Sequence, residues 1–118
     1  MKSYTVKITD KAEKMMERYL AHLVYEKQNM QAAIAVSDDY DETVVELEAV
    51  AGSLRFCDDA DLRNREIRKI EFRRHDYILL YKVQEDVAIV EAVYHTLQDY
   101  ENLFKDEVDD YITNRSDV

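Results

Sequence analysis

The chain of 118 residues contains no proline and a single glycine, Gly52. These two residue types are the usual points at which helices and strands are interrupted. Most of the chain should therefore form long helices and plain strands joined by short connections. The length is about that of one domain, and the mixture of 47% hydrophobic and 36% charged residues is typical of an ordered globular protein. We expect one domain, residues 1–118, with one core.

Membrane and secretory segments are not expected. The apolar run from Tyr77 to Tyr81 is far shorter than the ~20 residues of a membrane span, and no basic segment followed by an apolar stretch opens the chain. The single cysteine, Cys57, cannot form an internal disulfide, and a lone thiol is normal in a reducing compartment. We therefore expect a cytoplasmic protein that does not contact a membrane.

Charge is unevenly distributed along the chain. The formal net charge of −10 argues against sequence-independent binding to nucleic acid over the whole surface. The stretch from Arg63 to Lys82 nevertheless has a local charge of +4, since it holds seven basic and three acidic residues. Acidic residues gather in 38–61 and 99–118 instead. The pattern indicates a basic strand inside an acidic protein.

In the first half of the chain the spacing of apolar residues changes once, from alternation to helical spacing. Residues 3–9 alternate between apolar and polar, which predicts a half-buried strand. From residue 10, capped by Thr9 or Asp10, apolar residues recur every three or four positions and predict a helix to about Lys27. After a polar connection a second helix continues to Gly52, where a left-handed residue would end it. The two helices should form an antiparallel hairpin, and residues 58–64 a polar loop leading out of it.

Three strands are expected next, at 66–73, 77–83 and 87–94. Three-residue connections separate them, so neighbouring strands must be antiparallel. The middle segment is apolar on both faces and should lie inside the sheet. Helical spacing then predicts a C-terminal helix over 97–112, followed by a frayed tail over 113–118. The expected fold class is α+β: an N-terminal strand, an antiparallel helical hairpin, a three-strand antiparallel meander and a C-terminal helix.

Several segments carry a family resemblance. They are Tyr4-Thr5-Val6-Lys7-Ile8-Thr9 with Ala12, Ile67-Arg68-Lys69-Ile70, Tyr77-Ile78-Leu79-Leu80-Tyr81, and Val87 to His95 followed by Leu97-Gln98-Asp99-Tyr100-Glu101-Asn102. With the element order, they resemble the RelE/ParE superfamily of toxins from type II toxin–antitoxin systems. The resemblance implies a cognate antitoxin protein as partner. It also implies a target, which is the ribosome with its mRNA for RelE-like toxins and DNA gyrase for ParE-like toxins.

Ribosome-dependent mRNA cleavage is our main functional expectation. Metal-free cleavage needs an acid–base group beside fixed cations. His95 is the acid–base candidate because histidine titrates near neutral pH, and Tyr94 would orient a base or phosphate. The candidate phosphate ligands are Arg68, Lys69, Arg73 and Arg74. No cofactor is expected, and neither is a metal, because the three histidines lie far apart in sequence.

Two positions depart from the ribonuclease pattern. RelE-like enzymes commonly have an arginine where this chain has Ile78, and a basic residue where it has Thr96. Losing one fixed transition-state contact can cost about 10²- to 10³-fold in rate. Two alternatives therefore stay open: a non-enzymatic, ParE-like toxin that binds gyrase, and a non-toxic homologue that retains antitoxin binding. In each case the basic strand could bind an acidic antitoxin peptide, and the C-terminal helix could form a homodimer.

Overall fold

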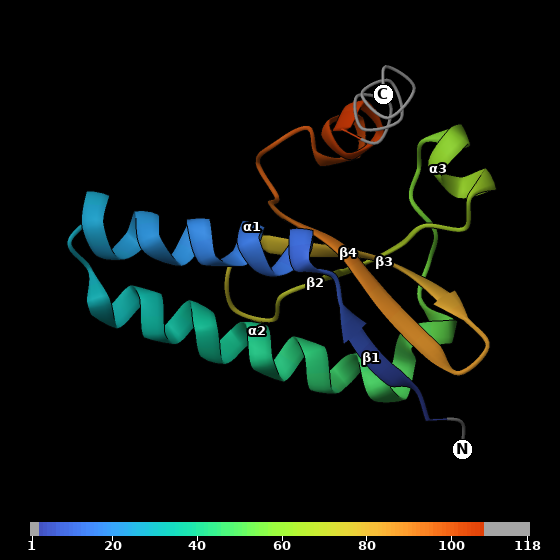
Figure 1. The fold of residues 1–118 in the computed structure, drawn as a ribbon, viewed down its shortest axis with the longest axis horizontal. Coiled ribbons are helices and arrows are strands. Elements are labelled where there is room, and N and C mark those ends of the chain that lie inside the picture. Colours follow the sequence, from blue (N-terminus) through green and yellow to red (C-terminus); the bar gives the residue numbers. More distant parts are fainter. Residues whose placement is uncertain (1–2, 108–118) are drawn as a thin grey trace.

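Residues 3–107 are described by the computed structural model, and they form a four-stranded sheet with helices packed on its two faces (Figure 1). The elements are β1 (Thr5–Ile8), α1 (Asp10–Ala21), the π-helix η1 (His22–Glu26), α2 (Met30–Val50), the 3-10 helix η2 (Ala51–Ser53), α3 (Ala60–Asn64), β2 (Arg68–Glu71), β3 (Tyr77–Gln84) and β4 (Val87–His95). A C-terminal helix begins at Tyr100 and is described as far as Glu107. The α+β class and the expected element order are confirmed.

The strand order is β1-β4-β3-β2. The strands β2, β3 and β4 form the expected antiparallel meander, and β1 pairs in parallel with β4. The apolar strand β3 lies inside the sheet, where residues 77–81 are all buried. The basic strand β2 lies at the edge. Tyr77 and His95 are paired residues, so the end of β4 lies beside the turn that joins β2 to β3.

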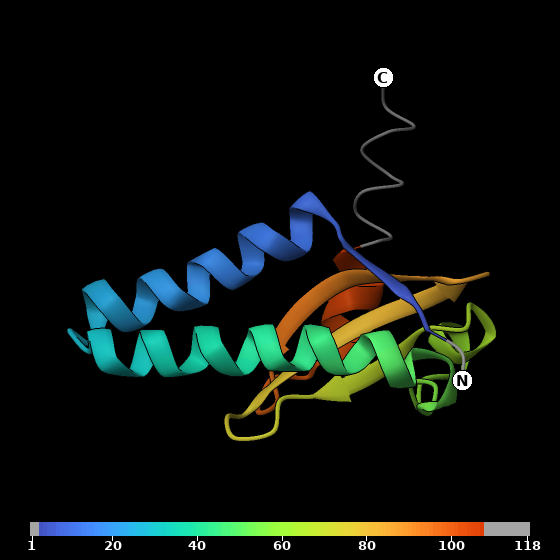
Figure 2. The ribbon, with the colours of Figure 1, turned by 90° about the horizontal axis from the view of Figure 1, so that it is seen from below.

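Two hydrophobic clusters lie on opposite faces of the sheet. The helical hairpin covers one face, where residues such as Met16, Val36 and Leu47 pack against alternate strand residues. Phe104 of the C-terminal helix, 3% exposed, packs with Leu62 of α3 on the other face. The C-terminal helix therefore packs on its own sheet. Figure 2 shows that the connected ends of α1 and α2 project beyond the strands.

The first helix begins at Asp10 because Thr9 caps it. The Thr9 side-chain oxygen accepts a hydrogen bond from the N–H of Ala12 at 3.1 Å. Regular α-helix ends at Ala21, and the π-helix carries the chain to Glu26, close to the expected end at Lys27.

Gly52 does not have the conformation that we expected. It has no positive φ and lies within the 3-10 turn η2, so no left-handed residue ends α2. A Cβ at this position would lie 1.9 Å from the Tyr4 hydroxyl. Glycine is needed here because the Tyr4 side chain passes close to the backbone.

Several boundaries also differ from the sequence prediction. The strand expected over 66–73 is shorter, and only Arg68–Glu71 pairs with β3. Residues 58–64 are not all loop, because the Asp59 carboxylate caps α3 by accepting hydrogen bonds from the N–H groups of Asp61 and Leu62. The C-terminal helix starts at Tyr100 instead of residue 97, since the chain first makes a turn in which the N–H of Leu97 donates to the His95 ring. The expected helix beyond residue 107 and the tail 113–118 lie outside the described residues.

Within residues 3–107, no helix has the length and apolar content of a membrane span.

Candidate functional site

His95 ends β4 with its ring held in place on one side. The ring packs edge-on against Tyr77, with centroids 5.1 Å apart. Its Nδ1 atom lies 3.1 Å from the N–H of Leu97 and accepts a hydrogen bond from it. A neutral ring that accepts at Nδ1 carries its proton on Nε2. The N–H of Leu97 thus occupies the Nδ1 side of the ring.

Tyr94 lies on the opposite face of the sheet from His95, as successive strand residues do. It is 2% exposed, belongs to the cluster beneath the C-terminal helix, and donates a hydrogen bond to the Glu107 carboxylate at 3.1 Å. Burial, aided by the nearby Glu107 charge, raises the pKa of Tyr94 well above its ordinary value. The two candidate catalytic residues therefore do not face a common site.

Lys69 is buried inside the molecule instead of facing solvent. Its ammonium group lies 2.9 Å from a Glu101 carboxylate oxygen and 3.3 Å from both the Tyr100 hydroxyl and the Asp58 carboxylate. Burial acts to lower the pKa of Lys69, but the hydrogen bonds to Glu101 and Tyr100 outweigh it and the pKa lies above its ordinary value. Lys69 thus fastens the C-terminal helix to the edge strand.

Arg68 points toward the other face and is also bonded within the molecule. Its guanidinium group donates to the carbonyl of Leu54 and lies 4.2 Å from the centroid of the Phe56 ring. The cation therefore stacks on an aromatic face and caps a backbone oxygen. Both contacts connect the 54–56 segment to β2. They give Arg68 a structural role and explain its position without a ligand.

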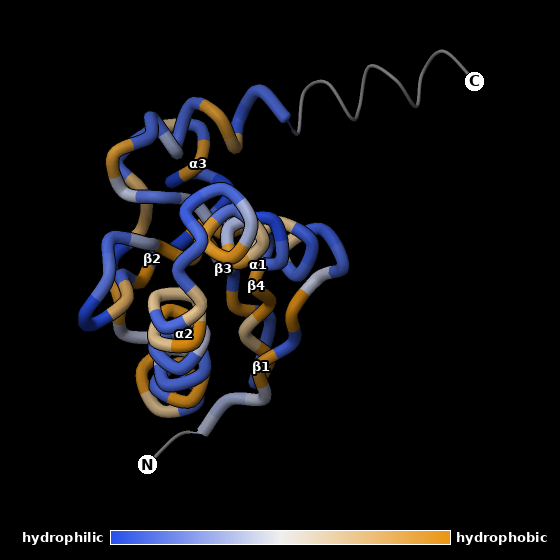
Figure 3. The backbone as a smooth tube through the Cα atoms, turned by 90° about the vertical axis from the view of Figure 1, so that its left-hand side faces the viewer, coloured by the Kyte–Doolittle hydropathy of each residue, from blue (hydrophilic) through white to orange (hydrophobic). Residues whose placement is uncertain are grey.

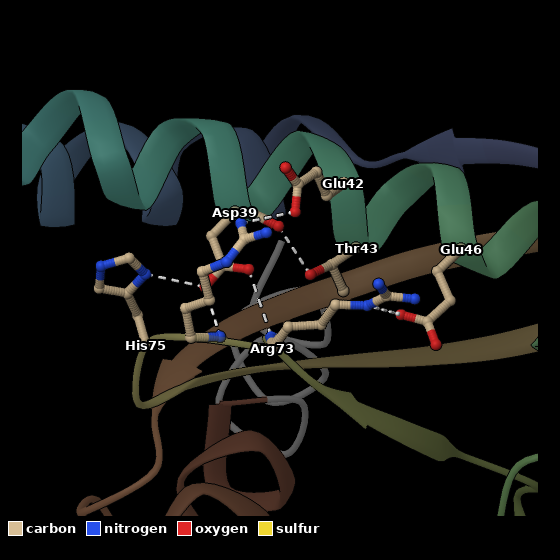
Figure 4. Close-up of polar contacts among 7 residues, drawn as sticks. Asp39, Glu42, Thr43, Glu46, Arg73 and His75 are labelled. Carbon is tan, nitrogen blue, oxygen red and sulfur yellow. Dashed lines mark hydrogen bonds and ion pairs between the residues drawn. The ribbon is translucent and has the colours of Figure 1, made fainter.

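Arg73 and Arg74 follow β2 in a turn that lies against α2, and Figure 4 shows Arg73 beside Glu46. Arg73 pairs with Glu46 at 3.2 Å and Arg74 with Glu42 at 2.8 Å. Both arginine side chains remain 61% exposed. Exposed ion pairs of this kind contribute little stability, about 0–1 kcal/mol. The carboxylates of a binding partner can therefore replace Glu46 and Glu42.

Asp39, which the sequence analysis did not single out, holds this turn in place. Its carboxylate is fully buried and accepts hydrogen bonds from the N–H of Arg73 at 3.3 Å, from the N–H of Arg74 at 3.0 Å and from the His75 ring at 2.8 Å. Burial acts to raise the pKa of Asp39, but the bonds from His75, Arg74 and Arg73 outweigh it and the pKa lies below its ordinary value. The one sequence signal for this site is the helical spacing of Asp39, Glu42 and Glu46 opposite a basic turn.

The six residues expected to form a site are thus divided among separate places. The Arg73–Asp76 turn and His95 do lie at the same end of the sheet, since the N–H of Thr96 donates to the Asp76 carbonyl at 2.8 Å. In the described chain, however, none of the four basic side chains contacts the His95 ring. Residues 3–107 also contain no cluster of three or more histidine, cysteine, aspartate or glutamate side chains that could hold a metal ion.

The strand order and the helical hairpin define an α+β fold, and comparison with known proteins gives the family. The family model described as the ParE toxin of the type II toxin–antitoxin system parDE matches residues 6–100. The chain therefore belongs to the ParE toxin family, part of the superfamily that its sequence resembles. No curated protein matches the sequence.

A solved structure supports the same fold. The chromosomal ParDE toxin–antitoxin system from P. aeruginosa contains a chain that superposes with a TM-score of 0.66 at 17% sequence identity. The match covers 79% of this chain and 96% of that chain. At this identity the likeness concerns the fold, so it assigns no residue roles.

Proposed function

We propose that this ParE-family toxin acts by binding a protein target, DNA gyrase, without cleaving RNA, and that a cognate antitoxin neutralises it. The observation that carries the choice of target is the ParE family match over residues 6–100. The burial of Lys69 among Glu101, Tyr100 and Asp58 argues against RNA cleavage. A cation committed to three partners inside the molecule is not available to stabilise a reacting phosphate.

The geometry of the other residues supports the same choice. Nδ1 of His95 accepts a backbone hydrogen bond, and Tyr94 lies buried on the opposite face, so the two candidate catalytic side chains do not act at one place. Ile78 and Thr96 occupy two positions where RelE-like ribonucleases commonly carry basic residues. A toxin that acts by binding a protein does not need catalytic residues and cations gathered at one site.

mRNA cleavage is the second candidate function. The observation in its favour is that the exposed Arg73–Arg74 turn lies at the same end of the sheet as His95. Cleavage would require His95 to give up its bond to the N–H of Leu97.

We also propose that the antitoxin presents acidic residues to Arg73 and Arg74. Their ion pairs with Glu46 and Glu42 are exposed, so carboxylates of a partner can replace them without uncovering the core. The turn itself stays in place during such an exchange, because its backbone is bonded to Asp39. Arg68 and Lys69, which we first expected to bind the antitoxin, are buried or stacked inside the molecule.

The target is tested with the purified full-length chain in two assays run side by side. One measures supercoiling of relaxed plasmid by gyrase, and the other measures the integrity of mRNA on translating ribosomes. We expect supercoiling to fall while the mRNA stays intact. The His95→Ala variant should inhibit gyrase as well as the wild type, because no acid–base step is involved.

The outcomes separate the candidates. Cleavage of ribosome-bound mRNA that disappears in His95→Ala would establish the ribonuclease. Unchanged supercoiling and intact mRNA, together with harmless overexpression, would identify a non-toxic homologue. Antitoxin contact is measured separately, with the purified antitoxin and the Arg73→Ala/Arg74→Ala variant. Unchanged affinity in that variant would exclude the turn as the antitoxin contact.

A further inference from the structure

The turn after β2 faces two kinds of carboxylate from α2. Asp39 is fully buried and binds the backbone of the turn, through the N–H groups of Arg73 and Arg74. Glu42 and Glu46 bind the guanidinium ends of the arginine side chains, Glu42 at 2.8 Å and Glu46 at 3.2 Å. Figure 4 shows the three acidic residues on the side of α2 that faces the turn. The backbone of the turn and the charge of its side chains are therefore controlled by different residues.

Glu42 and Glu46 are not needed to hold the turn in place. The buried Asp39 carboxylate accepts hydrogen bonds from two backbone N–H groups and from the His75 ring, and these contacts already position the turn. The two glutamate pairs lie at the surface, where the Glu42 side chain is 47% exposed and the Glu46 side chain 31% exposed. Surface pairs of this kind contribute little to stability. Their main effect is therefore on the charge that the turn presents.

The two glutamates cancel the charge of the two arginines. Arg73 and Arg74 are exposed, and without nearby carboxylates they would present two positive charges on a chain whose formal net charge is −10. Each arginine is instead paired with a glutamate of the same chain. A carboxylate that belongs to the chain is always close to its arginine, so it competes with an outside ligand at a high effective concentration. An acidic partner that binds the arginines must therefore displace the glutamates.

We propose that Glu42 and Glu46 are internal competitors of the partner that binds Arg73 and Arg74. They lower the affinity of the turn for the carboxylates of an acidic partner, and so they set the strength of the contact. A partner that displaces them finds the turn still fixed by Asp39, so binding does not require the backbone of the turn to become ordered. This inference rests on the proposed antitoxin contact at the same turn, and it adds the residues that weaken that contact.

The same helix offers a matched control. Hydrophilic residues recur around α2, as Figure 3 shows in a view along the helix. Asp41 and Glu48 are exposed and lie on the other side of α2 from the turn, since the helix completes one revolution in about 3.6 residues. The control variant Asp41→Asn/Glu48→Gln therefore removes two negative charges and leaves both arginine pairs intact. The glutamine variant Glu42→Gln/Glu46→Gln removes two negative charges and both pairs. Comparing the two variants separates local competition from the overall charge.

The test uses the purified full-length chain and a fluorescein-labelled octaglutamate peptide, with binding followed by fluorescence anisotropy at low salt. We expect the glutamine variant to bind the peptide about three- to tenfold more tightly than the wild type, because two weak ion pairs no longer compete. The control variant should change the affinity by less than about twofold, since its charges act from a distance and are screened. Adding Arg73→Ala/Arg74→Ala to the glutamine variant should remove the gain in affinity.

Two outcomes would overturn the proposal. Equal affinities of the glutamine variant and the control variant would mean that the peptide responds only to the overall charge. A gain in affinity that survives without the two arginines would mean that the glutamates compete for some other group. Failure of the antitoxin contact is distinguishable, because it is measured with the purified antitoxin: competition for the peptide would then stand while the antitoxin binds elsewhere. Circular dichroism of each variant checks that the fold is retained.

Discussion

The Asp39 carboxylate lies 2.8 Å from Nδ1 of the His75 ring, although the two residues are 36 positions apart in the sequence. The same carboxylate accepts hydrogen bonds from the backbone N–H groups of Arg73 and Arg74. A buried carboxylate is tolerated only when its oxygens are satisfied, and here three donors satisfy them. This cluster joins the helical hairpin to the turn at the end of the sheet (Figure 4).

Asp39→Asn should destabilise the fold. The substitution removes the charge and places an NH₂ group against backbone donors, which costs about 2–4 kcal/mol of unfolding free energy for a buried, hydrogen-bonded carboxylate. Urea unfolding monitored by circular dichroism measures the loss. Asp38→Asn, one position earlier and exposed, is the matched control and should change stability by less than about 0.5 kcal/mol. Similar values for the two variants would contradict a structural role for Asp39.

The effect of Asp39 should also depend on pH. Its pKa lies below the ordinary value of 3.8 in the folded chain, so the unfolded chain binds more protons between the two values. The stabilisation is complete above pH 3.8 and is lost as the pH falls through the folded value. The stability difference between the wild type and Asp39→Asn should therefore be constant near neutral pH and shrink in acid. A constant difference down into acid would disprove the lowered pKa.

Lys69→Met should release the C-terminal helix. It preserves most of the side-chain volume but leaves the Glu101 carboxylate, 15% exposed, without its cation, at an expected cost of about 3–5 kcal/mol. Denaturation and hydrogen exchange of residues 100–107 measure the effect. Lys105→Met, which breaks an exposed pair with Asp59, should cost at most about 1 kcal/mol. The double variant Lys69→Met/Glu101→Gln should recover part of the loss, and no recovery would argue against the pairing.

Gly52→Ala should destabilise the chain through a steric clash. The added methyl group would overlap the Tyr4 hydroxyl, and overpacking of this kind costs about 1–3 kcal/mol. Thermal unfolding measures the change. Tyr4→Phe in the same chain should relieve only part of it, since the hydroxyl is the nearest atom but Cζ of the ring would still lie 2.9 Å from the added carbon. If Gly52→Ala is instead as stable as the wild type, the Tyr4 side chain is able to move aside.

Cys57 should react with thiol reagents only after unfolding. The residue is 1% exposed, and burial raises the pKa of its thiol to about 12, so little reactive thiolate forms near neutral pH. We expect the reaction with a disulfide reagent to be slower by about a hundredfold or more in the folded chain than in denaturant. Fast modification under native conditions would show that the cluster beneath the C-terminal helix opens readily.

The elements of the fold could be predicted because their patterns are local. Alternation around Val6 predicts β1, helical spacing after Thr9 predicts the hairpin, and three-residue connections require the antiparallel meander. The parallel pairing of β1 with β4 was not predicted. It joins segments about 80 residues apart, such as Val6 and Ala88, and no local pattern specifies that pairing.

The candidate site could be predicted only as a set of residue types. Residue order alone specifies the basic strand, the acidic second helix and the histidine at the end of β4. The burial of Lys69 against Glu101, and the contact of Asp39 with the turn at Arg74, follow only from how the elements pack. Those contacts depend on which elements pack together across more than 30 positions of chain, whereas periodicity and charge are properties of neighbouring residues.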